Sequence, residues 1–256
     1  MGEPPITVLI PTYNHEKYIE AAIESVVNQT IFDVCRVIVS DDCSLDNTFQ
    51  RATRASANFG NITVRRNIRN LGIMPHYATL VASVSTPFVA ILEGDDVWLS
   101  TRKLELQHEI LVREPRAGMC FSACVVEYSG TGSRRELPHW NNGRNRIVSA
   151  VDLIYDNFIA TFSNCFFRTA LLTDVASQPE WQSGYDWLCN LQIASAADVW
   201  FLAAPCTLYR VHRKGAWSAM SRRQRRAAIL RTLQSFKEKA PHDLRPYVDD
   251  AMQVLV

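Results

Sequence analysis

The sequence predicts an α/β protein built on a mainly parallel sheet flanked by helices. Short apolar runs rich in Val and Ile alternate with segments in which apolar residues recur at helical spacing. The runs are apolar on both faces, which is typical of strands that helices cover on both sides. Sheets of this kind bind ligands beyond the carboxyl ends of their strands, so the polar residues that follow each strand are the candidates for function.

The first hundred residues contain four predicted strands, at 6–10, 37–39, 62–64 and 88–92. Helices are expected between them, at 19–27, from the polar cluster after residue 40 to about 57, and at 73–84. In the first helix, apolar residues lie three and four positions apart, at Ile19, Ala22, Ile23, Val26 and Val27. Helices of 10–15 residues between strands are the usual crossover connections of a parallel sheet.

After residue 100 the pattern changes. Ser100 is expected to cap a helix that runs to about Arg113 and precedes Pro115. Ser149 is expected to cap a second, short helix. A third helix is expected at 186–194, and strands at 119–126, 162–168, 199–202 and 207–211. The segment 129–146 is rich in Gly, Ser, Arg and Asn, which predicts a mobile loop.

The chain divides into three predicted parts, residues 1–99, 100–218 and 219–256. The last begins in a basic region, because residues 213–239 hold nine Lys or Arg and a single acid, Glu238. Ile229, Leu230, Leu233 and Phe236 would share one side of a helix there. Two interpretations stay open: a helix packed on the domain with solvated charges, or a basic helix in which 219–239 contacts an anionic membrane surface.

Composition excludes several classes of protein. With 27 basic and 26 acidic residues the chain lacks the strong positive charge of a nucleic-acid binder. No apolar stretch approaches the roughly 20 residues of a membrane span, and no signal peptide is recognisable at the start. Seven cysteines without a CxxC pair favour buried, reduced thiols. We therefore expect a cytoplasmic protein, with membrane contact, if any, at the inner face of the cell membrane.

Polar clusters follow the first, second and fourth strands, at 11–14, 40–48 and 93–98. The third cluster, Glu93-Gly-Asp95-Asp96-Val-Trp98, concentrates carboxylates where their mutual repulsion would be costly. A bound divalent cation would relieve that repulsion, and oxygen ligands suit Mg²⁺ or Mn²⁺ completed by substrate phosphates. Neither GxGxxG nor GxxxxGK[ST] occurs, which disfavours dinucleotide dehydrogenases and P-loop ATPases. The expected ligand is a nucleoside diphosphate that departs as a leaving group.

Taken together, six segments resemble the inverting family-two glycosyltransferases, which have the GT-A fold. They are Ile6-Thr-Val-Leu-Ile-Pro-Thr-Tyr-Asn14, Val39-Ser-Asp-Asp-Cys-Ser-Leu-Asp-Asn-Thr48, Asn67-Ile-Arg-Asn-Leu-Gly72, Phe88-Val-Ala-Ile-Leu-Glu-Gly-Asp-Asp-Val-Trp98, Tyr185-Asp-Trp187 and Tyr209-Arg-Val-His212. The resemblance extends over residues 5 to about 218. It implies a Rossmann-like GT-A domain followed by a C-terminal helical extension. The segment 157–164 is similar to a bacterial subgroup associated with cell-surface polysaccharides.

The resemblance also implies site residues. The nucleotide would contact Pro11, Thr12, Tyr13, Asn14, Asp42, Asn70, Gly72 and Asp95, with Asp42 facing a uracil-like ring and Asp95 the ribose. Asp96 would bind the metal, and Asp186 would be the catalytic base. His212 is either a metal or diphosphate ligand or a structural residue. Arg210, Trp98 and Trp187 would face the sugar or acceptor, although both tryptophans are equally well interpreted as core aromatics.

Two departures from the family pattern stand out. Tyr185 replaces the glutamate that often precedes the base, and Tyr77-Ala78 replaces an Arg-Asn pair, so Arg69 or Arg210 would have to supply that contact. The expected function is transfer from a nucleoside-diphosphate sugar, UDP-linked, to a hydroxyl of a glycan, lipid-linked or protein acceptor, with Mn²⁺ or Mg²⁺. The alternatives are a catalytically silent nucleotide- or glycan-binding module and a sugar-phosphate nucleotidyltransferase. The latter would want a Gly-rich, Arg-containing loop where Pro11-Thr-Tyr-Asn14 stands.

Overall fold

The computed structural model describes residues 5–182, 186–212, 215 and 217–254. Within this part, ten strands form one sheet in the order β3-β2-β1-β4-β9-β6-β10-β5, with β7 paired to β6 and β8 to β10. The strands are β1 Ile6–Thr12, β2 Cys35–Asp41, β3 Ile62–Arg66, β4 Phe88–Ile91, β5 Val97–Trp98, β6 Ala117–Tyr128, β7 Arg134–Leu137, β8 Arg146–Val148, β9 Cys165–Arg168 and β10 Asp198–Val211. The predicted α/β class is confirmed.

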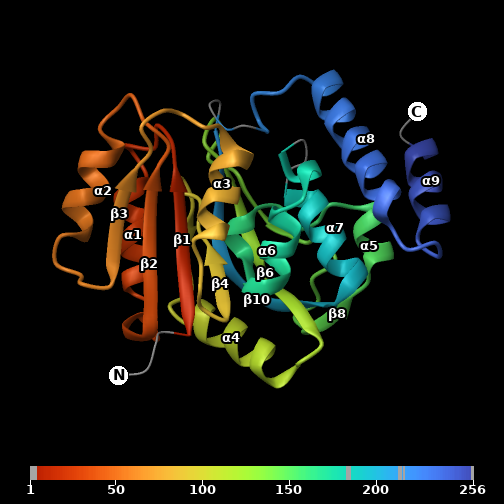
Figure 1. Cartoon of the computed structure of the whole chain (residues 1–256), viewed down its shortest axis with the longest axis horizontal. Helices are drawn as coiled ribbons and strands as arrows, with labels where there is room; N and C mark the ends of the chain where they lie inside the picture. Colours follow the sequence, from red (N-terminus) through yellow and green to blue (C-terminus); the bar gives the residue numbers. More distant parts are fainter. Residues whose placement is uncertain (1–4, 183–185, 213–214, 216, 255–256) are drawn as a thin grey trace.

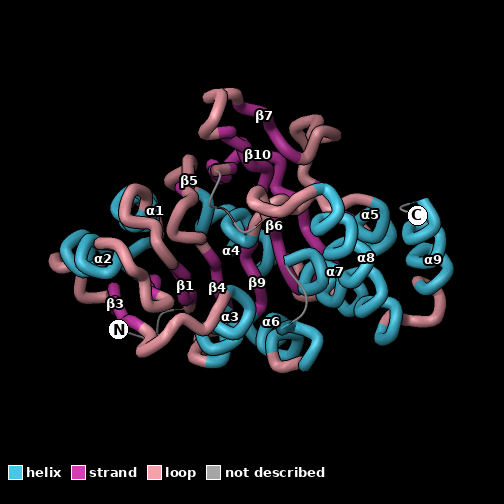
Figure 2. Tube along the Cα trace, turned by 90° about the horizontal axis from the view of Figure 1, so that it is seen from above, coloured by secondary structure: helices cyan, strands magenta, loops and turns pink. Residues whose placement is uncertain are grey.

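Helices cover both faces of the sheet (Figures 1 and 2). They are α1 Ile19–Val27, α2 Thr48–Ser56, α3 Ile73–Ala82, α4 Lys103–Arg113, α5 Ala150–Tyr155, α6 Thr169–Ala176, α7 Asp186–Ala196, α8 Arg222–Lys239 and α9 Arg245–Val254, with 3-10 turns at Phe32–Val34, Phe162–Asn164 and Pro179–Gln182. Alternate side chains of β1 serve two cores. Leu9 lies in one with α3, α6 and α7, whereas Val8 and Ile10 lie in the other with α1 and α4.

The half of the sheet that carries the site is parallel, as predicted. Ile6 of β1 lies opposite Cys35 of β2 and Phe88 of β4, so the three strands end at the same edge. Beyond β4 the sheet is mixed, because β9 runs antiparallel to both β4 and β6. Residues at the ends of β1, β2 and β4 can therefore reach the site from one side, and residues at the end of β10 from the other.

Four predictions of local structure were wrong in part. Segment 129–146 contains β7, which pairs with β6 from Leu137 opposite Cys124 to Arg134 opposite Glu127, so much of the expected loop is a hairpin. The expected strands 199–202 and 207–211 form a single strand, β10, which shifts register between Leu202 and Thr207. The expected strand 162–168 begins as a 3-10 turn. Ser100 lies before a turn, and the helix starts at Lys103.

The C-terminal extension is helical, as predicted, and α8 packs against α7 and α9. Ser221 caps α8 through a capping box with Gln224. Ala228, Thr232, Leu233 and Phe236 are the buried residues of α8. In the described part of the chain, no helix combines the length and apolar character needed to cross a membrane.

Candidate active site

Four strand ends converge on the candidate site. Gly94 donates its N–H to the carbonyl of Pro11 (3.0 Å), and Asp42 donates to Thr12 (2.9 Å), which joins the ends of β4 and β2 to β1. From the other side, the backbone N–H of Arg210 at the end of β10 donates to Asp96 Oδ1 (2.9 Å). The sequence clusters at 11–14, 40–48 and 93–98 therefore lie together, as expected from the parallel sheet.

The loops after β1 and β2 are joined to each other. Asn14, in the left-handed region at φ 57°, receives Leu45 N–H on Oδ1 (2.8 Å) and donates its own N–H to Ser44 Oγ (2.8 Å). Two residues further along each loop, Glu16 N–H donates to Asp46 Oδ2 (3.2 Å). Asn14 and Ser44 thus shape the loops, while the neighbouring Tyr13 remains 39% exposed and free to contact a ligand.

Asp42 organises the loop that follows β3. Its Oδ1 accepts from Asn67 Nδ2 (2.7 Å) and Leu71 N–H (2.9 Å), and its Oδ2 accepts from Gly72 N–H (3.0 Å). Asn70 Nδ2 donates to the carbonyl of Asp42 (3.0 Å). Asp42, Asn70 and Gly72 are therefore brought together as expected, but the Asp42 carboxylate is already engaged by the protein.

Asp95 faces two imidazoles. Its Oδ2 lies 2.9 Å from His212 Nε2 and 3.5 Å from His15 Nε2. His212 also stacks on Tyr18, with ring centroids 5.5 Å apart, and the Arg210 guanidinium lies over the same ring. Burial acts to raise the pKa of Asp95, but His15 and the hydrogen bond from His212 outweigh it and lower that pKa. Burial lowers the pKa of His15.

Asp96 is 1% exposed and points into the protein. Its Oδ2 accepts from Ser163 Oγ (2.6 Å) and Thr161 Oγ1 (3.2 Å), in addition to the Arg210 bond on Oδ1. Burial, and then the charges of Asp95 and Glu93, raise the pKa of Asp96 well above its ordinary value. Protein donors thus contact both oxygens of Asp96 in this structure, and its role as a metal ligand stays a prediction.

Glu93 explains one of the departures from the family pattern. Tyr77, which replaces the expected Arg-Asn contact, donates its hydroxyl to Glu93 Oε1 (2.8 Å), and Thr161 donates to Oε2 (2.6 Å). Burial, followed by the charge of Asp95, raises the pKa of Glu93. Hydrogen bonds and raised pKa values thus relieve part of the repulsion that the sequence predicted within the acidic cluster.

Asp186 is the first residue of α7 and is half-buried. Its Oδ1 accepts the N–H of Trp187 (2.8 Å). Desolvation and the charge of Glu93 raise the pKa of Asp186 to about 7. A carboxylate with this pKa is matched to proton removal near neutral pH. Tyr185, the second departure from the family pattern, lies outside the described residues, as do Arg213 and Lys214 of the basic region.

The two tryptophans belong to the protein interior. Trp98 is 4% exposed and donates Nε1–H to the carbonyl of Ser163 (2.8 Å), and Trp187 is 7% exposed and donates to Leu153 (2.8 Å). This burial agrees with the core interpretation, and a backbone carbonyl accepts the N–H of each indole. Arg210 is held near the site by Asp95, whose carbonyl accepts from Nη1 (2.7 Å).

Sequence reasoning missed four contributors to the site: His15, Tyr18, Thr161 and Ser163. His15 and Tyr18 lie in the turn that leads into α1, after the motif that ends at Asn14. Thr161 and Ser163 lie in the segment 157–164, which resembles the bacterial subgroup. A signal existed for the second pair, since two hydroxyls in a segment with four apolar residues can donate to buried carboxylates, but their partner, 65 and more residues away, cannot be identified from spacing.

Gly94 leaves no room for a side chain. A Cβ built there would lie 2.5 Å from Thr12 Oγ1, 2.7 Å from Thr12 Cβ and 3.0 Å from His15 Nδ1. We expect Gly94→Ala to lower the free energy of unfolding by about 1–3 kcal/mol through overpacking, measured by urea denaturation. Gly60→Ala is the matched control, because nothing lies within 4 Å of its Cβ. Equal stability of the two variants would show that the β1 and β4 loops separate easily.

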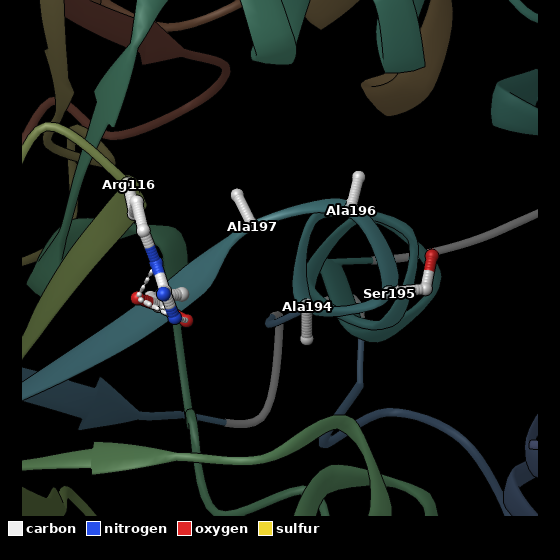
Figure 3. Close-up of a pocket in the computed structure, with 6 residues that line it drawn as sticks. Arg116, Ala194, Ser195, Ala196 and Ala197 are labelled. Atoms are coloured by element: carbon white, nitrogen blue, oxygen red, sulfur yellow. Dashed lines mark hydrogen bonds and ion pairs between the residues drawn. The ribbon is translucent and has the colours of Figure 1, made fainter.

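A hollow of about 490 Å³ lies elsewhere, bounded by Arg116 and residues 194–198 (Figure 3). Arg116 lies at one edge of it and pairs with Asp198 (3.1 Å). Asp198 begins β10, whereas Arg210 is near its end, so the hollow is at the opposite end of that strand from Asp95. Its lining offers one paired arginine and small side chains, and we assign no chemistry to it.

The fold and the acidic strand ends are those of the GT-A class of α/β proteins. The chain belongs to glycosyl transferase family 2, whose model matches residues 7–175. It also matches a solved mannosyltransferase from Pyrobaculum calidifontis, in complex with GDP-Man and Mn²⁺, with a TM-score of 0.72 and 20% identity over 98% of this chain and 70% of that one. At this identity the likeness supports the fold.

Two curated relatives are informative. An uncharacterized protein of Mycobacterium tuberculosis is 27% identical over 214 residues, which is 83% of this chain and 60% of that protein. WfgD of Escherichia coli, a UDP-Glc:alpha-D-GlcNAc-diphosphoundecaprenol beta-1,3-glucosyltransferase, is 32% identical over 113 residues, or 44% of this chain and 43% of the enzyme. The chain thus spans no more than about 60% of the length of these relatives.

Proposed function

We propose that this chain transfers a sugar from a UDP-sugar to a hydroxyl of a lipid-linked glycan, with inversion at the anomeric carbon. Family membership supports glycosyl transfer. The observation that carries the mechanism is the half-buried Asp186 carboxylate, with a pKa of about 7, beside the acidic cluster at the strand ends. The donor and acceptor classes follow the E. coli relative, whose name includes UDP-Glc and a diphosphoundecaprenol-linked sugar.

In the proposed reaction Asp186 accepts the proton of the acceptor hydroxyl as its oxygen attacks the anomeric carbon. The bond from that carbon to the diphosphate oxygen breaks with its electron pair leaving on the diphosphate. Because attack and departure occur on opposite faces, one displacement inverts the configuration. The chain contributes orientation of the two substrates and a positioned base, and the base is worth about 10²–10⁴-fold.

A divalent cation fits the residues around Asp95. The Asp95 carboxylate and the imidazoles of His15 and His212 offer oxygen and nitrogen donors of the kind that Mn²⁺ accepts. Among the described residues, no three His, Cys, Asp or Glu side chains are placed so that they could hold a metal ion by themselves. This suits an ion that diphosphate oxygens complete, and bound Mn²⁺ or Mg²⁺ would neutralise charge on the departing diphosphate. Asp95 and His212 would hold it, and the Mn²⁺ complex of the Pyrobaculum neighbour supports the choice.

The proposal is tested by nucleotide release. The purified chain is incubated with Mn²⁺, an undecaprenyl-diphosphate-linked sugar and each of a set of UDP- and GDP-sugars, and the free nucleoside diphosphate is measured. We expect release with at least one UDP-sugar that depends on both Mn²⁺ and acceptor. Tight binding of Mn²⁺ and UDP without release from any donor would instead identify a binding module. Release from GDP-sugars alone would overturn the UDP assignment.

A further inference from the structure

Three arginines of α8 are exposed to solvent, two in its first turn and one near its middle. Arg222, Arg223 and Arg231 are exposed, and within the described part of the chain they form no ion pair. The lysines at the other end of the helix differ, because Lys237 pairs with Asp249 (2.5 Å) and Lys239 with Glu180 (2.7 Å). These unpaired arginines therefore lie within the first ten residues of α8, and the paired lysines lie at its end.

These arginines do not serve the stability of the helix. The first turn of α8 contains no acidic residue, and cations there oppose the helix dipole, whose positive end lies at the N-terminus. The capping need is met separately by Ser221 and Gln224. Nor do the arginines cover a neighbouring helix, because the side of α8 that faces the domain is formed by Ala228, Thr232, Leu233 and Phe236.

The position of this surface relates it to the site. In Figure 1, α8 begins at the end of the molecule where β1, β2 and β3 also end, and then descends beside α7. The segment that leads into it follows directly from β10, which contains Arg210 and is followed by His212. Trp217, in that segment, is 37% exposed, and tryptophan is enriched at membrane–water interfaces.

We propose that Arg222, Arg223 and Arg231 dock the protein on an anionic membrane surface, with the strand ends facing the lipid. Charge complementarity carries the choice of partner, since anionic headgroups attract clustered Lys and Arg within a Debye length. The apolar side of α8 is occupied by the domain, so attachment is electrostatic and the helix does not insert its apolar side. The claim that the strand ends face the lipid depends on the lipid-linked acceptor of the proposed function. The claim that the arginines bind an anionic surface does not depend on it.

The test measures co-sedimentation of the full chain with vesicles of phosphatidylcholine alone or mixed with phosphatidylglycerol, without donor. We expect binding to the anionic vesicles at low salt and its loss at high salt. The triple variant Arg222→Gln, Arg223→Gln, Arg231→Gln should bind about 10²-fold more weakly, from about fivefold per arginine near an anionic surface. The matched control, Arg36→Gln, Arg54→Gln, Arg113→Gln, removes the same charge from exposed sites elsewhere and should bind normally.

Three results would overturn the docking proposal: unchanged binding by the α8 variant, equal loss in the control variant, or equal binding to neutral vesicles. Thermal unfolding of both variants checks that the fold is retained. Nucleotide release is measured in parallel without vesicles. If release persists while anionic vesicles are not bound, docking fails alone; if the vesicles are bound but no donor releases nucleotide, the proposed catalytic function fails alone.

Discussion

Asp186→Asn is expected to lower the rate of sugar transfer by about 10²–10⁴-fold while leaving Mn²⁺-dependent UDP binding nearly unchanged. The amide keeps the size of the side chain and can still accept the N–H of Trp187, but it cannot take a proton. Transfer is measured as nucleotide release under single-turnover conditions, and UDP binding by calorimetry. Transfer at the wild-type rate would remove Asp186 from the base role.

The pH dependence of the transfer rate should also report the ionisation of Asp186. The pKa of Asp186 is raised to about 7, and the base acts in its ionised form, so transfer should fall as pH decreases through about 7 and level off above it. Asp186→Asn should lose this acidic limb, because the titrating group is gone. A wild-type profile that stays flat from pH 5 to pH 8 would contradict the assignment.

Replacing Asp95 and Asp96 separately by asparagine is expected to give the second large effect, a loss of metal-dependent nucleotide binding in only one of the two variants. Asp95→Asn should weaken Mn²⁺-dependent UDP binding by at least about 10–100-fold, the loss typical even of residues that only support a metal ligand. Asp96→Asn should bind the nucleotide within a few-fold of wild type. Its effect should instead be on stability, about 1–3 kcal/mol, because buried hydroxyl and N–H donors lose an acceptor.

Calorimetry with Mn²⁺ and UDP, and urea denaturation of the same samples, separate the two roles. The matched design matters because both variants remove one carboxylate from adjacent positions. If Asp96→Asn loses metal-dependent binding and Asp95→Asn keeps it, the expectation from sequence was right and the geometric assignment is wrong.

The sequence predicted the parallel half of the fold well, because its strands and helices have regular local patterns of apolar residues. Helix α1 spans the same residues as predicted, 19–27, since its apolar spacing is regular. The later half was harder. The pairing of β9, and of β7 with β6, depends on the position of strands that local sequence patterns do not specify. The sequence predicts two strands where β10 is continuous, because Pro205 interrupts the strand pattern at the point where the register shifts.

The sequence indicated which polar segments come together better than it indicated the contacts of each side chain. Asp95 and Asp96 were both predicted to lie at the strand ends, but which of the two is buried depends on donors far along the chain, at 161, 163 and 210. His15 was missed because a single histidine in a turn has no local partner, and its proximity to Asp95 exists only after folding. The Tyr77-Ala78 departure suggested a missing contact, whereas Tyr77 supports Glu93 from within the core.

The hydrogen bonds that join the loops after β1 and β2 have a thermodynamic consequence. Asn14, Ser44 and Leu45 are fixed against one another by the chain itself. A ligand that binds against these two loops does not have to immobilise them, so the loops lose little conformational entropy on binding. Affinity for the nucleotide then reflects contacts made against a preformed surface, and any ordering cost of substrate binding falls on the other parts of the site.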